Sequence, residues 1–177
     1  SRLEIYDVDN LSTHGGSLRL YVRHIRLENP PALPAVAATV AEEQRAGLDK
    51  AGTYHDFADR VVKIKRDLVR FLMQHREAGL NVVGYGAPGK GNTLLNYCGI
   101  REDLLSYTVD LSEHKHGRYT PGTRIPIYHP MHIRETKPDY LLILPWNLKD
   151  EIMAQTACIR EWGGKWVVPI PNLQILD

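Results

Sequence analysis

The sequence is poor in cysteine, in long apolar runs and in net charge, and each shortage excludes a class of protein. The two cysteines, Cys98 and Cys158, lie far apart in segments with a helical pattern and have no metal-ligand spacing. No apolar run approaches the ~20 residues that cross a bilayer, and the net charge of +1 comes from well-mixed acidic and basic residues. We therefore expect a cytoplasmic protein with reduced thiols and no metal, membrane or nucleic-acid partner.

The chain does have 177 residues, 43% of them hydrophobic, which is enough for one ordinary domain with an appendage. Residues 1–28 alternate apolar and polar around a turn at Asp9–Asn10, which predicts a β-hairpin, and a single hairpin needs another sheet to pack on. Residues 29–79 form a proline-rich linker and two helices, the second with an N-cap at Thr53 and a stop at Gly79.

From residue 80 onward, strand patterns and helix patterns alternate. Strand-like apolar segments occur at 80–85, 105–109, 124–128, 140–144 and 165–170. Helical segments occur at 92–98 and 149–162. Such alternation is typical of βαβ units. We predict an α/β fold, with a Rossmann-like, mostly parallel sheet and flanking helices over residues 80–177, preceded by the β-hairpin and the two helices.

The most informative segment is the glycine turn, Gly84–Gly91, which follows an apolar strand and opens into a helix. A helix N-terminus presents free backbone N–H groups that favour an anion, glycines let the ligand approach the backbone, and a lysine adds charge. We expect a phosphate or diphosphate to bind here, with contacts from the following residues: Gly86, Pro88, Gly89, Lys90, Gly91, Asn92 and Thr93.

Neither standard phosphate motif is fully met. The dinucleotide pattern G-x-G-x-x-G fits Gly84–Gly89, but Pro88 and Lys90 are not typical of a nicotinamide-cofactor turn. The Walker pattern fails because Gly91 stands where a magnesium-binding Ser or Thr is needed. The alternative is a tight strand-to-helix turn that binds nothing.

Other candidate residues follow later strands, where ligands of open α/β sheets bind. Asp110 stands 24 residues after Gly86, near the usual distance for a carboxylate on a ribose, or it caps the turn before Ser112. Trp146 can stack on a base or sugar and Asn147 can hydrogen-bond, or the two close the core and cap a helix.

The loop at 113–123 is rich in cations, glycine and proline, which is typical of a lid or second phosphate clamp, or of a solvated connector. Lys115 and Arg118 are the cations expected to reach the anion. The pair His114 and His116 is a weak metal candidate, because no carboxylate-and-cysteine set accompanies it. The sequence offers no convincing nucleophile–base pair or carboxylate dyad, so we assign no catalytic residue.

Four segments together resemble the C-terminal domain of sugar C-methyltransferases: Tyr85–Asn96, Lys115–Gly122, Leu142–Asn147 and Pro169–Pro171. His14–Arg19 is also similar to the segment that joins the middle domain of these enzymes to the last one. The family uses S-adenosylmethionine and acts on nucleotide-linked deoxysugars, typically keto sugars on a dTDP carrier. Gly89 departs from the family, where alanine is expected.

The resemblance implies a three-part enzyme of which this chain is the last part. The hairpin at 1–28 would be a remnant of the preceding methyl-donor domain, which would bind S-adenosylmethionine, so that no cofactor binds this chain. Residues 80–177 would hold the diphosphate of the nucleotide sugar, with Asp110, Lys115, Arg118, Tyr119, Trp146 and Asn147 as further contacts. The chemistry implied is deprotonation beside a ketone and attack of the enolate on the donor methyl group, with the base in the missing portion. Two alternatives stay open: an NAD(P)-dependent oxidoreductase domain and a scaffold that binds no small molecule.

Overall fold

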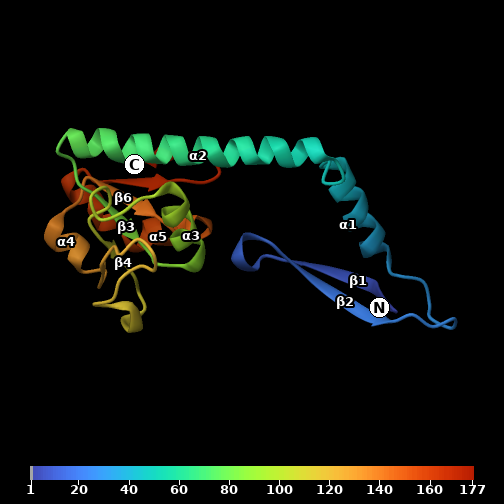
Figure 1. Ribbon diagram of the computed structural model, residues 1–177. Coiled ribbons are helices and arrows are strands. Elements are labelled where there is room, and N and C mark those ends of the chain that lie inside the picture. Colours follow the sequence, from blue (N-terminus) through green and yellow to red (C-terminus); the bar gives the residue numbers. More distant parts are fainter. Residues whose placement is uncertain (1) are drawn as a thin grey trace. The chain divides into compact units, whose positions relative to one another are not determined.

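The computed structural model describes residues 2–177, apart from the side chain of His14. The chain divides into two units, one up to Asp59 and one from Arg60 onward (Figure 1). The first unit contains a two-stranded antiparallel sheet, a helix and the beginning of a second helix, and the elements are these: β1 (Leu3–Leu11), β2 (Ser17–His24), α1 (Pro34–Arg45) and α2 (Ala51–Glu77).

The predicted hairpin is confirmed, but its turn was placed wrongly. Asp9 and Asn10 belong to β1, where they pair with Arg19 and Leu18. The chain reverses later, through a 3-10 helix at Thr13–Gly15 and a glycine at position 16 with a φ of +124°. The pairing register therefore depends on the glycines, which adopt a positive φ without steric cost.

The hairpin keeps a largely exposed apolar face. Among the described residues, β1 and β2 pair only with each other. Val8, which pairs with Leu20, is buried, but five other residues of this face are between 40% and 49% exposed: Leu3, Ile5, Leu18, Leu20 and Val22. Val8 is the only buried hydrophobic residue of the described chain up to Asp59, so this unit has very little core.

The second unit is built on a six-stranded sheet in the order β5-β4-β3-β6-β7-β8. All neighbouring strands run parallel except β7 and β8, which confirms the mostly parallel α/β prediction. The strands are β3 (Val82–Tyr85), β4 (Thr108–Val109), β5 (Ile127–Tyr128), β6 (Tyr140–Ile143), β7 (Lys165–Val168) and β8 (Gln174–Leu176).

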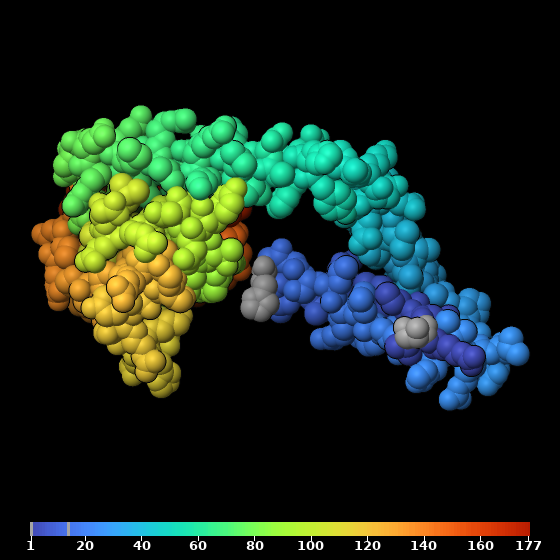
Figure 2. All heavy atoms as spheres, viewed as in Figure 1, coloured from blue at the N-terminus to red at the C-terminus, as the bar shows by residue number. Residues whose placement is uncertain are grey.

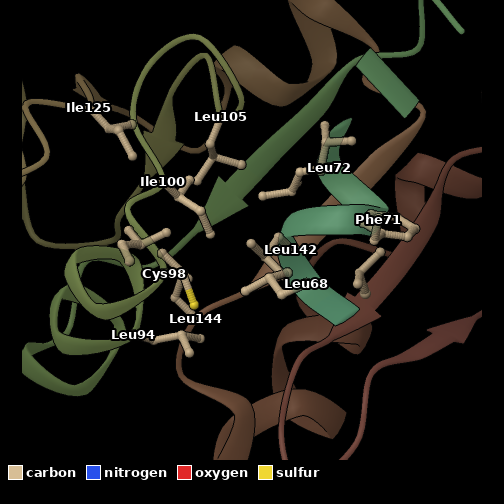
Figure 3. Close-up of a cluster of buried hydrophobic side chains, with 13 residues drawn as sticks. Leu68, Phe71, Leu72, Leu94, Cys98, Ile100, Leu105, Ile125, Leu142 and Leu144 are labelled. Carbon is tan, nitrogen blue, oxygen red and sulfur yellow. The ribbon is translucent and has the colours of Figure 1, made fainter. Parts of the chain in front are cut away.

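Helices cover both faces of this sheet. One face packs against α2 and α3 (Gly89–Cys98) through the cluster in Figure 3, which includes Leu68, Leu72 and Leu95. The other face packs against α4 (His132–Thr136), α5 (Lys149–Gln155) and the 3-10 helix η4 (Ala157–Trp162). Adjacent residues of β6 and β7 point to opposite clusters, which explains why the buried positions of these inner strands are apolar on both faces.

Several predicted boundaries are corrected by the structure. Thr53 is not an N-cap, because α2 begins at Ala51 and the Thr53 hydroxyl donates to the carbonyl of Gly47. Gly79 does end that helix: it has a φ of +75° and its N–H donates to the carbonyl of Arg76. The helix α3 begins at Gly89 instead of Asn92, so the last glycines of the turn belong to its first turn.

The predicted helix 149–162 is two helices. The helix α5 ends at Gln155 and η4 follows after Thr156, whose hydroxyl accepts a hydrogen bond from the buried Trp166 indole at 2.8 Å. The sequence pattern also missed α4 and the strand β8, which are only five and three residues long.

Candidate functional site

The glycine turn lies at the topological switch point of the sheet. β3 comes first in the chain, β4 and β5 follow on one side of it, and β6, β7 and β8 lie on the other. The strand order therefore reverses between β3 and β6, and their carboxyl ends lead into the glycine turn and into Pro145–Asn147. In open α/β sheets this crevice is where ligands bind.

Two glycines let the turn and α3 pack closely against the end of β6. Gly86 has a φ of +86°, and a Cβ there would lie 2.7 Å from the Pro145 side chain. A Cβ on Gly91 would lie 2.9 Å from the Cβ of Leu144. Gly89 has open space around it. The turn therefore requires glycine at 86 and 91 but not at 89.

The N-terminus of α3 presents unused donors at this crevice. The first helical hydrogen bond runs from the N–H of Asn92 to the carbonyl of Pro88, at 3.0 Å. The N–H groups of Gly89, Lys90 and Gly91 have no acceptor within residues 2–177. No acidic side chain occupies the first turn of this helix, so an external anion would meet these groups directly.

Three of the predicted residues come together beside that helix N-terminus. The ammonium of Lys90 donates a hydrogen bond to the side-chain oxygen of Asn147. It also lies 4.8 Å from the ring centroid of Trp146. Lys90 and Trp146 are half-buried and Asn147 is exposed. A cation is thereby held at the mouth of the crevice by contacts that an anionic ligand can replace.

Asp110 holds the glycine turn in place. Asp110 follows β4 and is only 8% exposed. Its carboxylate accepts hydrogen bonds from the N–H of Ala87 at 2.7 Å and from the ammonium of Lys115 at 2.8 Å. It also accepts one from the N–H of Ser112 at 2.9 Å, as the turn-capping alternative expected. Burial raises the pKa of Asp110, but the hydrogen bonds from Lys115, Ser112 and Ala87 together outweigh it, so the pKa lies below its ordinary value.

The loop between β4 and β5 projects from the second unit (yellow in Figures 1 and 2). Lys115 is its link to the glycine turn, since its ammonium contacts both Asp110 and the carbonyl of Ala87. Arg118 and Tyr119 are exposed, and the Arg118 side chain makes no hydrogen bond or ion pair with any described residue. The structure brings Lys115 to the turn, while contacts of Arg118 and Tyr119 with a ligand stay predictions.

A pocket of about 370 Å³ opens between α2, α3 and the end of β6. It is lined by Val61, Lys90, Thr93, Leu94, Tyr97, Trp146 and Ile170. Lys90, Thr93 and Trp146 were predicted from the sequence as site residues, whereas Val61, Tyr97 and Ile170 were not. Tyr97 could have been found, because it stands two helical turns after Lys90 on the same face of α3. No local signal marks Val61.

Other kinds of site find no support in the part of the chain that the structure describes. No three His, Cys, Asp or Glu side chains within it are grouped so that they could hold a metal ion. None of its helices has the length and apolar character needed to span a membrane. Burial raises the pKa of the Cys98 thiol to about 11, so this cysteine is protonated near neutral pH and is a poor nucleophile.

Two comparisons with known proteins, a family model and a curated relative, give the same family. The model described as "C-methyltransferase C-terminal domain" matches residues 12–171. The C-methyltransferase NovU of Streptomyces niveus is 36% identical over 178 residues, which are 99% of this chain and 41% of that protein. Among solved structures, UDP-D-quinovosamine 4-dehydrogenase of Vibrio fischeri has 21% identity and a TM-score of 0.41, over 55% of this chain and 93% of that one. The chain thus spans less than half of the curated relative.

Proposed function

The chain belongs to the family of C-methyltransferase C-terminal domains, and we propose that it binds the diphosphate of a nucleotide-linked keto-deoxysugar. In this proposal the free N–H groups of Gly89, Lys90 and Gly91 contact the diphosphate, and the ammonium of Lys90 neutralises part of its charge. The sugar is then presented to a methyl-donor domain that lies in the remainder of the longer protein, and this chain alone does not catalyse the transfer.

The convergence of Lys90, Trp146 and Asn147 at the switch point is the observation that carries the proposal. Lys90 and Asn147 are 57 residues apart in the sequence, yet their side chains are hydrogen-bonded beside a helix N-terminus with three unused donors. A cation and free amides at one crevice favour a ligand with at least one phosphate over a neutral metabolite.

The position of Asp110 supports a nucleotide sugar over a dinucleotide or S-adenosylmethionine in this chain. A carboxylate at the end of the second strand would hold the ribose hydroxyls of an adenosine cofactor. Here that carboxylate already accepts from Ala87, Lys115 and Ser112, which leaves it little capacity to accept from two ribose hydroxyls as well. The methyl donor is therefore assigned to the preceding part of the protein, and no step here involves it.

Calorimetric titration of the chain with dTDP-glucose, dTDP, NADH and S-adenosylmethionine tests the proposal. We expect binding of the two dTDP compounds only. Lys90→Ala should weaken that binding by ~1.5–3 kcal/mol, the scale of a charge-assisted hydrogen bond. Lys63→Ala is the matched control, because Lys63 is an exposed lysine of α2 that pairs with Asp67 and does not line the pocket beside Lys90.

The outcomes separate the alternatives. Unchanged dTDP-glucose affinity in Lys90→Ala would remove the lysine from the diphosphate site. Binding of NADH alone would replace the proposal with an oxidoreductase domain. A chain that binds none of the four compounds would be a scaffold.

A further inference from the structure

We infer that the pocket beside Lys90, lined by α2, α3, Trp146 and Ile170, receives the planar base of the nucleotide-linked substrate; this rests on the proposed function. The pocket measures about 370 Å³, within the ~300–1,000 Å³ typical of small-ligand pockets. Its lining is mostly apolar, and Thr93 and Lys90 are the only residues in its described lining that are neither aliphatic nor aromatic. A small number of polar groups in an apolar pocket fixes the orientation of a ligand without excluding an aromatic ring.

Two aromatic rings in this pocket each lie beside an ammonium group. The ammonium of Lys90 is 4.8 Å from the ring centroid of Trp146, and that of Lys65 is 5.1 Å from the centroid of Tyr97. Tyr97 is 45% exposed, although it faces a region rich in apolar side chains. Aromatic faces with cations beside them suit a ligand that combines a flat ring with negative charge, which describes a nucleotide.

Lys90 joins this pocket to the diphosphate site. Its backbone N–H is one of the three unused donors at the start of α3, while its side chain lines the pocket. A diphosphate held by those donors therefore places the attached nucleoside at the mouth of the pocket. When the ammonium of Lys90 turns toward the phosphates, it leaves the face of Trp146, and the base stacks there.

A second pocket, on the other side of the glycine turn, is less suited to the base of a nucleotide. It measures about 140 Å³ and is lined by residues that include Asp110 and Glu151. The Asp110 carboxylate is paired with Lys115, but Glu151 adds a further negative charge that disfavours a phosphate-bearing ligand. The space is also less than half that of the aromatic pocket. The geometry therefore favours the side of α3 that carries Tyr97 and Trp146.

Titrations of the chain with dTDP and with inorganic pyrophosphate test this inference, since only dTDP carries a base. Trp146→Leu should weaken dTDP binding roughly five- to 150-fold, the scale of one base–aromatic stack, and change pyrophosphate binding by less than about twofold. Trp146→Phe, which keeps an aromatic ring, should restore most of the dTDP affinity. Tyr97→Leu is a second variant at a half-exposed position, so it gives a result even if Trp146→Leu folds poorly.

Fluorescence gives an independent signal with a matched control. The Trp162 indole N–H donates to the carbonyl of Pro138, which precedes β6, whereas Trp146 follows β6. The two tryptophans therefore lie near opposite ends of this strand. dTDP should therefore quench the emission of Trp162→Phe as it does that of the unaltered chain, and quenching should disappear in Trp146→Phe.

The results that overturn the inference differ from those that overturn the proposed function. If Trp146→Leu and Tyr97→Leu bind dTDP as the unaltered chain does, while Lys90→Ala loses both ligands, the base lies elsewhere and the diphosphate site stands. If the unaltered chain binds neither dTDP nor pyrophosphate, the proposed function fails and this inference fails with it.

Discussion

Asp110 is the residue at which the glycine turn, β4 and the projecting loop are joined. Replacing it by Asn removes the charge that the ammonium of Lys115 pairs with and turns one acceptor into a donor facing the Ala87 N–H or Lys115. We expect Asp110→Asn to lower the free energy of unfolding by ~1–3 kcal/mol, measured by urea denaturation. Asp150→Asn is the control, because Asp150 is exposed and should change stability by less than about 0.5 kcal/mol. Equal effects of the two substitutions would show that the Asp110 contacts are not stabilising.

The lowered pKa of Asp110 also predicts the pH dependence of stability. The group is a carboxyl whose pKa in the folded state lies below its ordinary value of 3.8. Its contribution is therefore fully present above that value and is lost as the pH falls through the folded pKa. Urea denaturation between pH 6 and 2 should show that the free energy of unfolding falls less steeply with acidification in Asp110→Asn than in the unaltered chain. Identical slopes would contradict the pKa shift.

Gly89 and Gly91 are close in sequence but should respond oppositely to alanine. A Cβ at 89 meets nothing within 4 Å and the backbone there is helical, so Gly89→Ala should raise the free energy of unfolding by ~0.4–1 kcal/mol. A Cβ at 91 meets Leu144 at 2.9 Å, so Gly91→Ala should lower it by ~1–3 kcal/mol. Thermal unfolding of the two variants measures both. A stabilised Gly91→Ala would show that α3 and β6 are not tightly packed.

At the scale of elements, the break between α5 and η4 depends on a buried side-chain hydrogen bond. The Trp166 side chain is fully buried, and its N–H donates to the Thr156 hydroxyl, which donates in turn to the carbonyl of Ile152. Thr156→Val keeps the shape but leaves the indole N–H without that acceptor, and should cost ~1–3 kcal/mol in urea denaturation. Thr39→Val in α1 removes a hydroxyl that bonds only within its helix and should cost less than about 0.5 kcal/mol. If Thr156→Val lowers the free energy of unfolding no more than Thr39→Val does, this account of the break between α5 and η4 is wrong.

At the scale of the whole molecule, the two units differ in how much apolar surface they bury. The first has one buried hydrophobic residue among its described residues, and α1 has none, whereas the second has two clusters. Hydrogen exchange should therefore be at least about 100-fold faster for amides of β1 and β2 than for those of β3 and β6. Equal protection would show that the hairpin is stabilised by something beyond its own pairing.

The α/β architecture of residues 80–177 could be read from the sequence because its signals are local. Inner strands of a parallel sheet are buried on both faces, so β3, β6 and β7 are short apolar runs between helical segments. The glycine turn and Lys90 were also identifiable, since a strand, glycines and a helix follow one another directly. Short elements such as α4 and β8 were missed, because three to five residues give too little periodicity to recognise.

The sequence by itself determined the fold class and the position of the glycine turn between β3 and α3, because periodicity and glycine placement are properties of neighbouring residues. Only the tertiary structure decided which strand ends meet. It placed Asn147 against Lys90, directed Asp110 toward the N–H of Ala87, and brought Tyr97 and Trp146 into one pocket. All three pairs lie 23 to 57 positions apart in the sequence. Their proximity follows from the order of strands in the sheet, which no local pattern specifies.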